Sequence, residues 1–364
     1  MEQMARPIIL LGWLLPFQAL AADPPGPAIA LDSVTLDASK LRVHFIDIGP
    51  GLAVLIETPN DRRHIFVDGG KWGLADMSEY VSRFVPTTTP IDIAIVTHAD
   101  SDHYKGMKRI FDTYDVRSFW YTGYTSTTLS GLPTWTGFLQ QVDDEEGCAV
   151  YSPISNWVSA GDTEVIDDGG TADTQDDIVV QYLNVDSNPP ERGPIFGRSF
   201  DEGERRNNAS LVFKLVYKDV SFLFTGDING RRKEHESAST DDEIDSEELE
   251  LWVRHQLDAK YSLKATVLQA PHHGSNGSCS LRFIQAVDPE WVVITAGHQF
   301  NHPHPAALRR FATAGIEASH VLRTDEGDST PEVSSVRDPR GDDCYVFETD
   351  GVTVTRILRV RVGG

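Results

Sequence analysis

The sequence predicts an α/β protein whose folded part runs from residue 41 to residue 362. Short apolar runs rich in β-forming residues alternate there with segments of helical periodicity. Of the 364 residues, 40% are hydrophobic and 9% are aromatic, which is enough to build a sizeable core. Nearly every histidine with polar neighbours directly follows an apolar run. Because the end of a strand is rigid yet opens onto a loop, this placement is typical of ligand-binding residues.

The first half of this region begins with two strands that Pro50-Gly51 separates into a hairpin-like pair. The segment 91–97 is dominated by apolar residues, as is typical of a strand buried on both faces, and it leads directly into His98. The expected strands are 41–48, 52–58, 64–67, 91–97 and 118–121, and the expected helices are 75–84, 107–114 and 135–146.

The second half shows a similar succession of strands and helices, without an internal repeat at the level of residues. Residues 232–246 are charged and low in complexity, which predicts a disordered acidic loop. The expected strands are 178–183, 212–216, 222–225, 265–270, 291–295 and the last ones within 344–362, and the expected helices are 246–257 and 305–314.

Residues 1–22 are expected to be a signal peptide rather than part of the fold. Arg6 precedes a short apolar stretch, and small residues suit cleavage by a signal peptidase near Ala21 or Ala22. A Pro/Ala-rich linker is expected over residues 23–40. We therefore expect a periplasmic or secreted protein, with no integral membrane domain apart from the N-terminal signal.

The chain contains three cysteines, Cys148, Cys279 and Cys344. An odd number in an oxidising compartment permits one disulfide and leaves one thiol over. Cys279 and Cys344 both lie in the C-terminal half and are the favoured pair. The sequence has no CxxC and no Cys/His finger spacing, so a structural zinc site is not expected.

The net charge restricts the class of substrate. Fifty-five acidic residues against thirty-two basic ones leave a formal net charge of -23. The electrostatic field of this charge repels polyanions. A nucleic-acid partner is therefore possible but disfavoured, and a small-molecule or phosphoester substrate is preferred.

The run from His98 to His103 is the strongest indication of chemistry. It reads His-Ala-Asp-Ser-Asp-His, so six residues hold two imidazoles and two carboxylates, all of which bind divalent metals. Four such groups directly after a buried strand would be electrostatically costly without a cation. Later strand ends add further candidate ligands, which are Asp227, His272, His273, His302 and His304.

These motifs together resemble the metallo-β-lactamase superfamily, in the variant where the second histidine of the signature loop is Asp100. That variant is similar to the C-terminal hydrolase-like domain of the competence protein ComEC. The matching stretches, in family order, are 45–49, 67–70, 98–103, 207–211, 224–227, 271–275 and 302–305. The resemblance implies a four-layer αββα sandwich of two mixed sheets, with metals at one edge of the sheets.

The resemblance also implies roles for single residues. His98 and Asp100 would bind a first metal, and Asp102 and His103 would bind a second, with Asp227 bridging the two. Asp68 would orient a ligand or a water molecule, which makes Asp68, Asp102 and Asp227 the expected catalytic carboxylates. From the two later loops we favour His272 and His302 as the ligands that complete the metal shells. Alternative ligands or substrate contacts are His273, His304, Asn208, Ser275 and Lys105.

Two divalent cations about 3.5–4 Å apart can hold a bridging hydroxide and stabilise both the attacking and the leaving oxygen. Asp100 adds a hard oxygen ligand, which shifts the preference from zinc toward manganese without excluding zinc. A carboxylate-rich site acidifies water less, and this favours phosphoesters.

The expected function is therefore an exported metal-dependent hydrolase of phosphoesters or phosphodiesters, similar to a nuclease. The first alternative is a hydrolase of small esters, lactones or wall-linked phosphocholine, which the negative charge favours. The second alternative is a non-catalytic metal-binding module, which the intact ligand set disfavours. The channel of the competence protein is absent, so this chain is not expected to translocate DNA.

Overall fold

The computed structural model describes residues 22–195, 197, 199–230, 246–297, 300, 302–326 and 343–362. The predicted signal peptide lies outside these ranges except for Ala22, and the predicted acidic loop lies outside them except for Ser246, which is buried. Within the described ranges, no helix is both long and apolar enough to cross a membrane.

The described strands form two mixed sheets, one of nine strands and one of seven. In spatial order, the first sheet contains β1 (Ile29–Ala30), β16 (Val354–Arg361), β15 (Cys344–Thr349), β2 (Leu41–Phe45), β3 (Val54–Glu57), β4 (His64–Val67), β5 (Ile93–Val96), β6 (Ser118–Tyr121) and β7 (Ala149–Tyr151). The second contains β14 (Val321–Arg323), β13 (Trp291–Ile294), β12 (Val267–Gln269), β11 (Val220–Phe224), β10 (Val212–Tyr217), β9 (Ile178–Asn184) and β8 (Thr163–Asp167).

Each sheet is antiparallel in one part and parallel in another. Strands β15, β2, β3 and β4 pair antiparallel, and β4 to β7 then continue in parallel. In the second sheet β8 to β11 pair antiparallel and β11 to β14 pair in parallel. Since neighbouring parallel strands end at the same edge of a sheet, the loops after β4, β5, β11 and β12 are placed at two facing edges.

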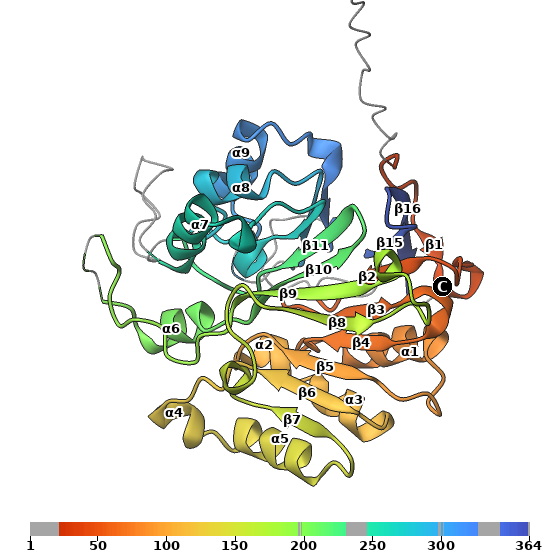
Figure 1. The fold of residues 1–364 in the computed structure, drawn as a ribbon, viewed down its shortest axis with the longest axis horizontal. Helices are drawn as coiled ribbons and strands as arrows, with labels where there is room; N and C mark the ends of the chain where they lie inside the picture. Colours follow the sequence, from red (N-terminus) through yellow and green to blue (C-terminus); the bar gives the residue numbers. More distant parts are fainter. Residues whose placement is uncertain are drawn as a thin grey trace, which may run out of the picture.

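Three apolar clusters fill the spaces between the layers, and Figure 1 shows helices outside each sheet. One cluster lies between the sheets, where Phe45 of β2 stacks on Phe224 of β11. A second lies under α1 (Leu74–Phe84), α3 (Met107–Thr113) and α5 (Pro133–Asp144). The third lies under α7 (Glu247–Leu257), α8 (Leu281–Val287) and α9 (Pro305–Thr313). This layering confirms the predicted αββα sandwich.

Strand β2 shows how the sequence produces a strand buried on both faces. Leu41, Val43 and Phe45 alternate into the cluster between the sheets. Between them, Arg42 and His44 point to the helical side, where His44 Nδ1 lies 3.0 Å from the hydroxyl of Tyr80 in α1. His44 Nε2 lies 2.8 Å from a carboxylate oxygen of Glu57, so the polar side chains on this face are paired.

The segment 23–40, which we expected to be a linker, packs onto the domain instead. β1 pairs in parallel with β16, the last strand of the chain. Leu31 and Val34 are 4% and 3% exposed and belong to the cluster under α1. The linker prediction is therefore wrong from Ile29 to Val34, because two apolar side chains are buried there and a neighbouring strand completes the backbone hydrogen bonds.

Most of the expected strands and helices are present, with ends shifted by a few residues. The sequence reasoning missed the shortest elements and two helices that are rich in polar residues or flanked by loops. The missed elements are β1, β7, β8, β14, α2 (Ser101–Tyr104), α4 (Thr127–Ser130), α6 (Glu202–Asn208) and α8.

The favoured disulfide between Cys279 and Cys344 is absent, and none of the three cysteines, which the structure describes, forms a disulfide. Cys279 lies in the cluster under α7 and α8, and its Sγ lies 3.5 Å from the carbonyl oxygen of Pro271. Cys344 lies in the cluster on the other side of the sandwich. The two thiols thus occupy different layers, and the disulfide prediction is wrong for that reason.

Helix α7 begins with two buried carboxyl groups in contrasting surroundings. Glu248 accepts hydrogen bonds from the backbone N–H groups of Cys279 (2.6 Å) and Ser280 (2.9 Å). Glu247 is 3% exposed, and one of its carboxylate oxygens has no hydrogen-bond partner. Burial, with a further contribution from Glu250, raises the pKa of Glu247 to about 8.

This raised pKa predicts that Glu247 makes the protein less stable as the pH rises. Between its ordinary pKa of 4.5 and about 8, the unfolded chain loses the proton that the folded chain keeps, so the free energy of unfolding falls with pH. Glu247→Gln removes this penalty. The substitution should therefore raise the free energy of unfolding by a few kcal/mol more at pH 8 than at pH 5. Urea unfolding at both pH values measures the difference.

The exposed carboxyl group of Glu317 provides the control for this experiment. Glu317→Gln should leave the dependence of stability on pH unchanged. If the Glu247→Gln protein follows the same pH dependence as the unmutated chain, Glu247 is ionised in the folded state and this account of it is wrong.

Candidate metal centre

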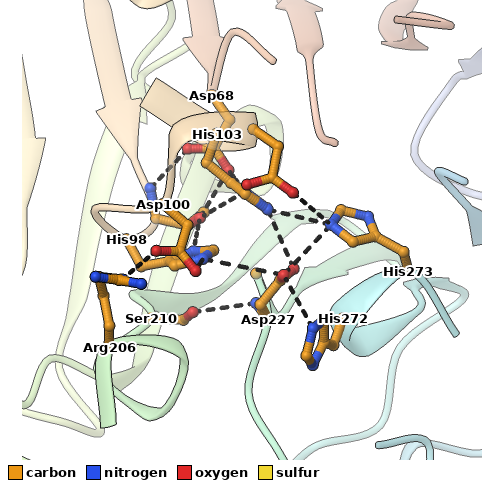
Figure 2. A network of polar contacts seen from close by, with 12 residues as sticks. Asp68, His98, Asp100, His103, Arg206, Ser210, Asp227, His272 and His273 are labelled. Atoms are coloured by element: carbon orange, nitrogen blue, oxygen red, sulfur yellow. Dashed lines mark hydrogen bonds and ion pairs between the residues drawn. The ribbon is translucent and has the colours of Figure 1, made fainter. Parts of the chain in front are cut away.

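The predicted ligands meet where the two sheets present the ends of their parallel strands (Figure 2). From the first sheet, Asp68 follows β4, and His98 follows β5 after one intervening residue. His103 lies on the single turn of α2, which begins directly after Asp100. From the second sheet, Asp227 follows β11. The loop after β12 carries His272 and His273.

Asp227 lies at the centre of this cluster and is 3% exposed. Its carboxylate oxygens lie 3.2 Å from His103 Nε2, 3.3 Å from His273 Nε2 and 3.9 Å from His98 Nε2. Burial opposes ionisation of Asp227, but His273, His103 and His272 outweigh it and lower the pKa of this carboxyl well below its usual value. The cluster therefore places an anionic carboxylate among imidazoles that come from the loop after β5, from α2 and from the loop after β12.

Two groups of side chains could hold a metal ion, and they share His103. His98, His103 and Asp227 offer ligand atoms within 4.8 Å of one another, and so do Asp102, His103 and His273. Imidazole nitrogens and carboxylate oxygens are the usual ligands of zinc and related divalent ions. These two groups contain four of the seven predicted metal ligands, and a fifth, Asp100, lies beside them with its Oδ2 3.7 Å from His98 Nε2.

The surroundings of His98 and His103 fit a cation. His98 is fully buried, and its Nε2 has no hydrogen-bond partner although carboxylate oxygens lie on two sides. His103 Nε2 and His273 Nε2 face each other at 3.3 Å. Burial disfavours a charged imidazole at His103, but Asp227 and Asp68 outweigh burial and raise its pKa well above the usual value. Positive charge is therefore favoured at the point where these nitrogens meet.

Asp68, to which the family resemblance assigns the orienting of a ligand or a water molecule, contacts His103. Its Oδ2 lies 2.8 Å from His103 Nδ1, and the two oxygens accept hydrogen bonds from the backbone N–H (2.8 Å) and the hydroxyl (2.6 Å) of Thr97. A carboxylate only accepts hydrogen bonds, so Nδ1 carries a proton and Nε2 is directed at Asp227 and His273.

Thr295, directly after β13, holds the ring of His273 through its backbone carbonyl group. Its carbonyl oxygen lies 2.7 Å from His273 Nδ1, which assigns the proton of this ring to Nδ1. His273 Nε2 is then available to the cluster. Thr295 was not anticipated from the sequence, although it ends a predicted strand.

The histidine of the 271–275 loop that faces the cluster is His273, whereas we favoured His272. His272 Nε2 lies 3.8 Å from Asp227, and its Nδ1 lies 3.1 Å from the side-chain oxygen of Asn229. Both histidines have left-handed backbone conformations, with φ of 48° and 54°. Such a turn reverses the side-chain directions that an extended chain would give, and this is the physical reason for the difference.

His302, the other favoured histidine, lies beside the cluster. Its ring centroid is 5.7 Å from that of His272 and 6.5 Å from that of His273. Burial and the neighbouring histidines lower its pKa to about 3, so the ring is neutral at physiological pH. His304 instead begins α9, where its Nδ1 accepts a hydrogen bond from the backbone N–H of Ala306.

The remaining candidates occupy supporting positions. The side-chain oxygen of Asn208 accepts hydrogen bonds from the backbone and side chain of Asn229, which in turn contacts His272. The hydroxyl of Ser275 lies 2.9 Å from that of Ser278. Lys105 is half-buried at the C-terminal end of α2.

Arg206 is a component of the site that sequence reasoning missed. An ion pair joins Arg206 Nε, from α6, to Asp100 Oδ1. The amide of Asn207, in the orientation that satisfies its neighbours, donates to Asp100 Oδ2 at 3.0 Å. Burial opposes ionisation of Asp100, but His98 and Arg206 outweigh it and lower the pKa of this carboxyl. Two adjacent arginines in an acidic stretch were the signal that could have drawn attention to α6.

The signature loop is held in place by a close approach of two backbones. Gly69 N donates to the carbonyl oxygen of His103 at 2.6 Å, and Gly106 N donates to that of Gly70 at 2.8 Å. A Cβ at Gly106 would overlap the carbonyl oxygen of Gly69, and a Cβ at Gly69 would overlap the backbone of Gly106 and Met107. Glycine is thus required at both positions for α2 to lie against the turn that carries Asp68.

Comparison with known proteins identifies the family. Residues 46–298 match the model of the Metallo-beta-lactamase superfamily, and the chain belongs to that superfamily. It is 25% identical to ComE operon protein 3 of Bacillus subtilis over 316 residues, which are 79% of this chain and 32% of that protein. It is also 25% identical to competence protein ComA of Neisseria gonorrhoeae over 283 residues, 77% of this chain and 30% of that protein.

The chain therefore spans about a third of the length of these curated relatives. Among solved structures, the metallo-beta-lactamase fold protein YhfI from Bacillus subtilis is similar, with a TM-score of 0.47 and 8% sequence identity. That similarity covers 85% of this chain and all of YhfI.

The contact between Asp68 and His103 leads to a first prediction for this site. Asp68→Asn removes the negative charge that holds the Nδ1 proton of His103, so the affinity for Zn²⁺ should fall roughly 10- to 100-fold. Competition with a fluorescent zinc chelator measures the affinity. Asp92→Asn is the matched control, because Asp92 is also buried and paired, but with Arg63 and Arg117. Equal affinities for the Asp68→Asn and Asp92→Asn proteins would contradict the assigned role.

The two histidine loops give a second prediction. His273→Ala should reduce the number of metal ions bound per chain, because it removes a nitrogen that both Asp227 and His103 face. His304→Ala should leave that number unchanged and instead cost about 1 kcal/mol of stability through loss of the helix cap. Elemental analysis after dialysis and thermal unfolding separate the two effects. Unchanged metal content in the His273→Ala protein would contradict the assignment of His273 as a metal ligand and would favour His272 and His302 instead.

Proposed function

We propose that this chain is an exported metal-dependent hydrolase that acts on phosphoesters, with phosphodiesters as the preferred class. The observation that carries the proposal is the buried group of imidazoles and carboxylates around Asp227, with the guanidinium of Arg206 at its edge. Membership of a superfamily that is generally hydrolytic supports the reaction type.

A divalent cation held by His98, His103, His273 and Asp227 would act as a Lewis acid that activates water and polarises a phosphoryl oxygen. Zn²⁺ and Mn²⁺ both suit these donors. Two ions are proposed because the Asp227 carboxylate lies near imidazoles of both ligand groups, while His103 Nε2, with one electron pair, could serve only one ion.

The protein positions the imidazoles and fixes their protons. Asp68 and the carbonyl oxygen of Thr295 keep the protons of His103 and His273 on Nδ1, which leaves both Nε2 atoms as electron-pair donors. Ser210 fixes the loop after β11 by accepting a hydrogen bond from the backbone N–H of Asp227 at 3.0 Å. Because these partners are buried, little reorganisation is needed when substrate arrives.

Arg206 supplies the reason for preferring an anionic substrate. The net charge of -23 works against anions in general, so a local cation is needed to attract a phosphate. Arginine has five N–H donors in a planar fork that matches phosphate oxygens, and Asp100 holds this fork at the cluster. The same charge disfavours long nucleic acids, so a short phosphodiester is the better substrate.

The names of the relatives, ComE operon protein 3 and competence protein ComA, agree with the resemblance to the competence protein, which supports the choice of phosphodiesters. The competing proposal is a hydrolase of small neutral esters or lactones, which the overall negative charge favours. Removal of residues 1–22 on export belongs to the first proposal, and the mass of the protein recovered outside the cytoplasm would test it.

The proposed activity is tested with purified protein loaded with Mn²⁺ or Zn²⁺, assayed against bis-p-nitrophenyl phosphate, a short single-stranded oligonucleotide and a lactone. We expect turnover of the two phosphodiesters. Asp227→Asn should lower kcat/KM roughly 100-fold or more, because it removes the central carboxylate. Arg206→Ala should raise KM for the phosphodiesters, while a neutral ester should be much less affected.

Asp288→Asn is the control, because Asp288 is an exposed residue that pairs with Lys264. This variant should keep full activity. If the lactone alone is turned over, and that activity is lost in the Asp227→Asn protein, the phosphoester proposal is wrong and the ester proposal takes its place.

A further inference from the structure

A second pocket lies away from the metal centre, at the edge strands of the two sheets. It has a volume of about 620 Å³, which is within the range of small-molecule sites. Its walls come from β6 and β7 of the first sheet, from β8 and β9 of the second, and from the loop after β7. None of its lining residues belongs to the candidate metal centre.

Four aromatic side chains line this pocket. They are Trp120, Tyr151, Trp157 and Tyr182. The rings of Tyr151 and Trp157 lie 5.2 Å apart at 71°, and those of Trp120 and Tyr151 lie 6.5 Å apart at 81°. Nearly perpendicular rings form adjacent walls of a corner, so that one small group can contact more than one ring.

Trp157 is the exposed member of this aromatic set. Its side chain is 53% exposed, whereas Trp120 and Tyr182 are 3% and 1% exposed. The pocket therefore has a buried aromatic base and one accessible tryptophan at its rim. An exposed tryptophan beside a pocket is a frequent feature of binding sites, because the ring offers a large apolar face at little entropic cost.

Two carboxylates lie on the same wall. Glu164 Oε2 accepts a hydrogen bond from the Tyr182 hydroxyl at 2.7 Å, which holds this carboxylate beside the rings. Asp162 accepts a hydrogen bond from the backbone N–H of Ser159 at 2.8 Å. Lys260 lies behind the neighbouring Gly161 and interacts with Asp162, so Glu164 supplies most of the negative charge that faces the pocket.

We propose that this pocket binds a small organic cation through an alkylammonium group. The electron-rich faces of aromatic rings attract such cations, and Glu164 adds a charge of opposite sign. An alkylammonium group is weakly hydrated compared with a metal ion, so it can enter an aromatic pocket at a lower desolvation cost. The overall charge of -23 also attracts cations from solution. The proposal does not depend on the function of the metal centre.

The test is a calorimetric titration of the full chain with choline and with its neutral isostere 3,3-dimethylbutan-1-ol. The two molecules have nearly the same shape, so their difference isolates the charge. Cation–π contacts predict that choline binds roughly 2- to 30-fold more tightly than the alcohol. Quenching of tryptophan fluorescence by choline should follow the same curve.

Variants at the rim test the location of the binding. Trp157→Ala and Glu164→Gln should each weaken choline binding, whereas Trp157→Phe should restore most of it because the aromatic face is kept. Val165→Ala is the matched control, because Val165 is 50% exposed and follows Glu164 on the opposite face of β8. Circular dichroism establishes that each variant is folded, and the Asp227→Asn protein should bind choline as the unmutated chain does.

Three results would overturn the proposal. The first is equal binding of choline and its neutral isostere, which would make the pocket simply apolar. The second is binding of N-acetylglucosamine without binding of choline, which would make it a sugar site. The third is choline binding that neither Trp157→Ala nor Glu164→Gln weakens, which would place the cation elsewhere.

Discussion

The carboxylate of Asp68 links three segments that are distant in the sequence. It ends β4, accepts two hydrogen bonds from Thr97 at the end of β5, and holds the ring of His103 on α2. Because Asp68 is fully buried, water does not compete for these contacts. The direction of His103 Nε2, and with it the meeting point of His98, His273 and Asp227, depends on this one group.

The second constraint is that each sheet supplies part of the cluster. His98 and His103 come from the first sheet, while Asp227 and His273 come from the second, and the apolar cluster between the sheets fixes their separation. Arg206 reaches the same point from α6, which leads into β10. The chemistry of the site is therefore tied to the packing of aromatic pairs such as Phe45 and Phe224.

The sequence was sufficient for the layers and for the groups that directly follow strands. His98, Asp68 and Asp227 were predictable because each comes at or next to the end of an apolar run, and parallel pairing brings such ends together. The choice between His272 and His273 was not predictable, because it depends on two left-handed residues. Arg206 and the pairing of β1 with β16 depend on contacts between distant segments, which no local pattern indicates. The role of Asp68 in orienting a ligand came from the family resemblance rather than from periodicity.

The contact between Gly69 and Gly106 limits how this site can change during evolution. The atoms that a new Cβ would meet are mainly backbone atoms of the facing segment, so a smaller neighbouring side chain cannot make room for it. Second-site suppressors of substitutions at either glycine should accordingly be rare. Asp100, by contrast, pairs with the side chain of Arg206 on α6, so a substitution at one of these positions can be compensated by a substitution at the other. Two glycines that flank the signature loop in space are thus fixed by geometry, whereas Asp100 within the loop is open to compensated replacement.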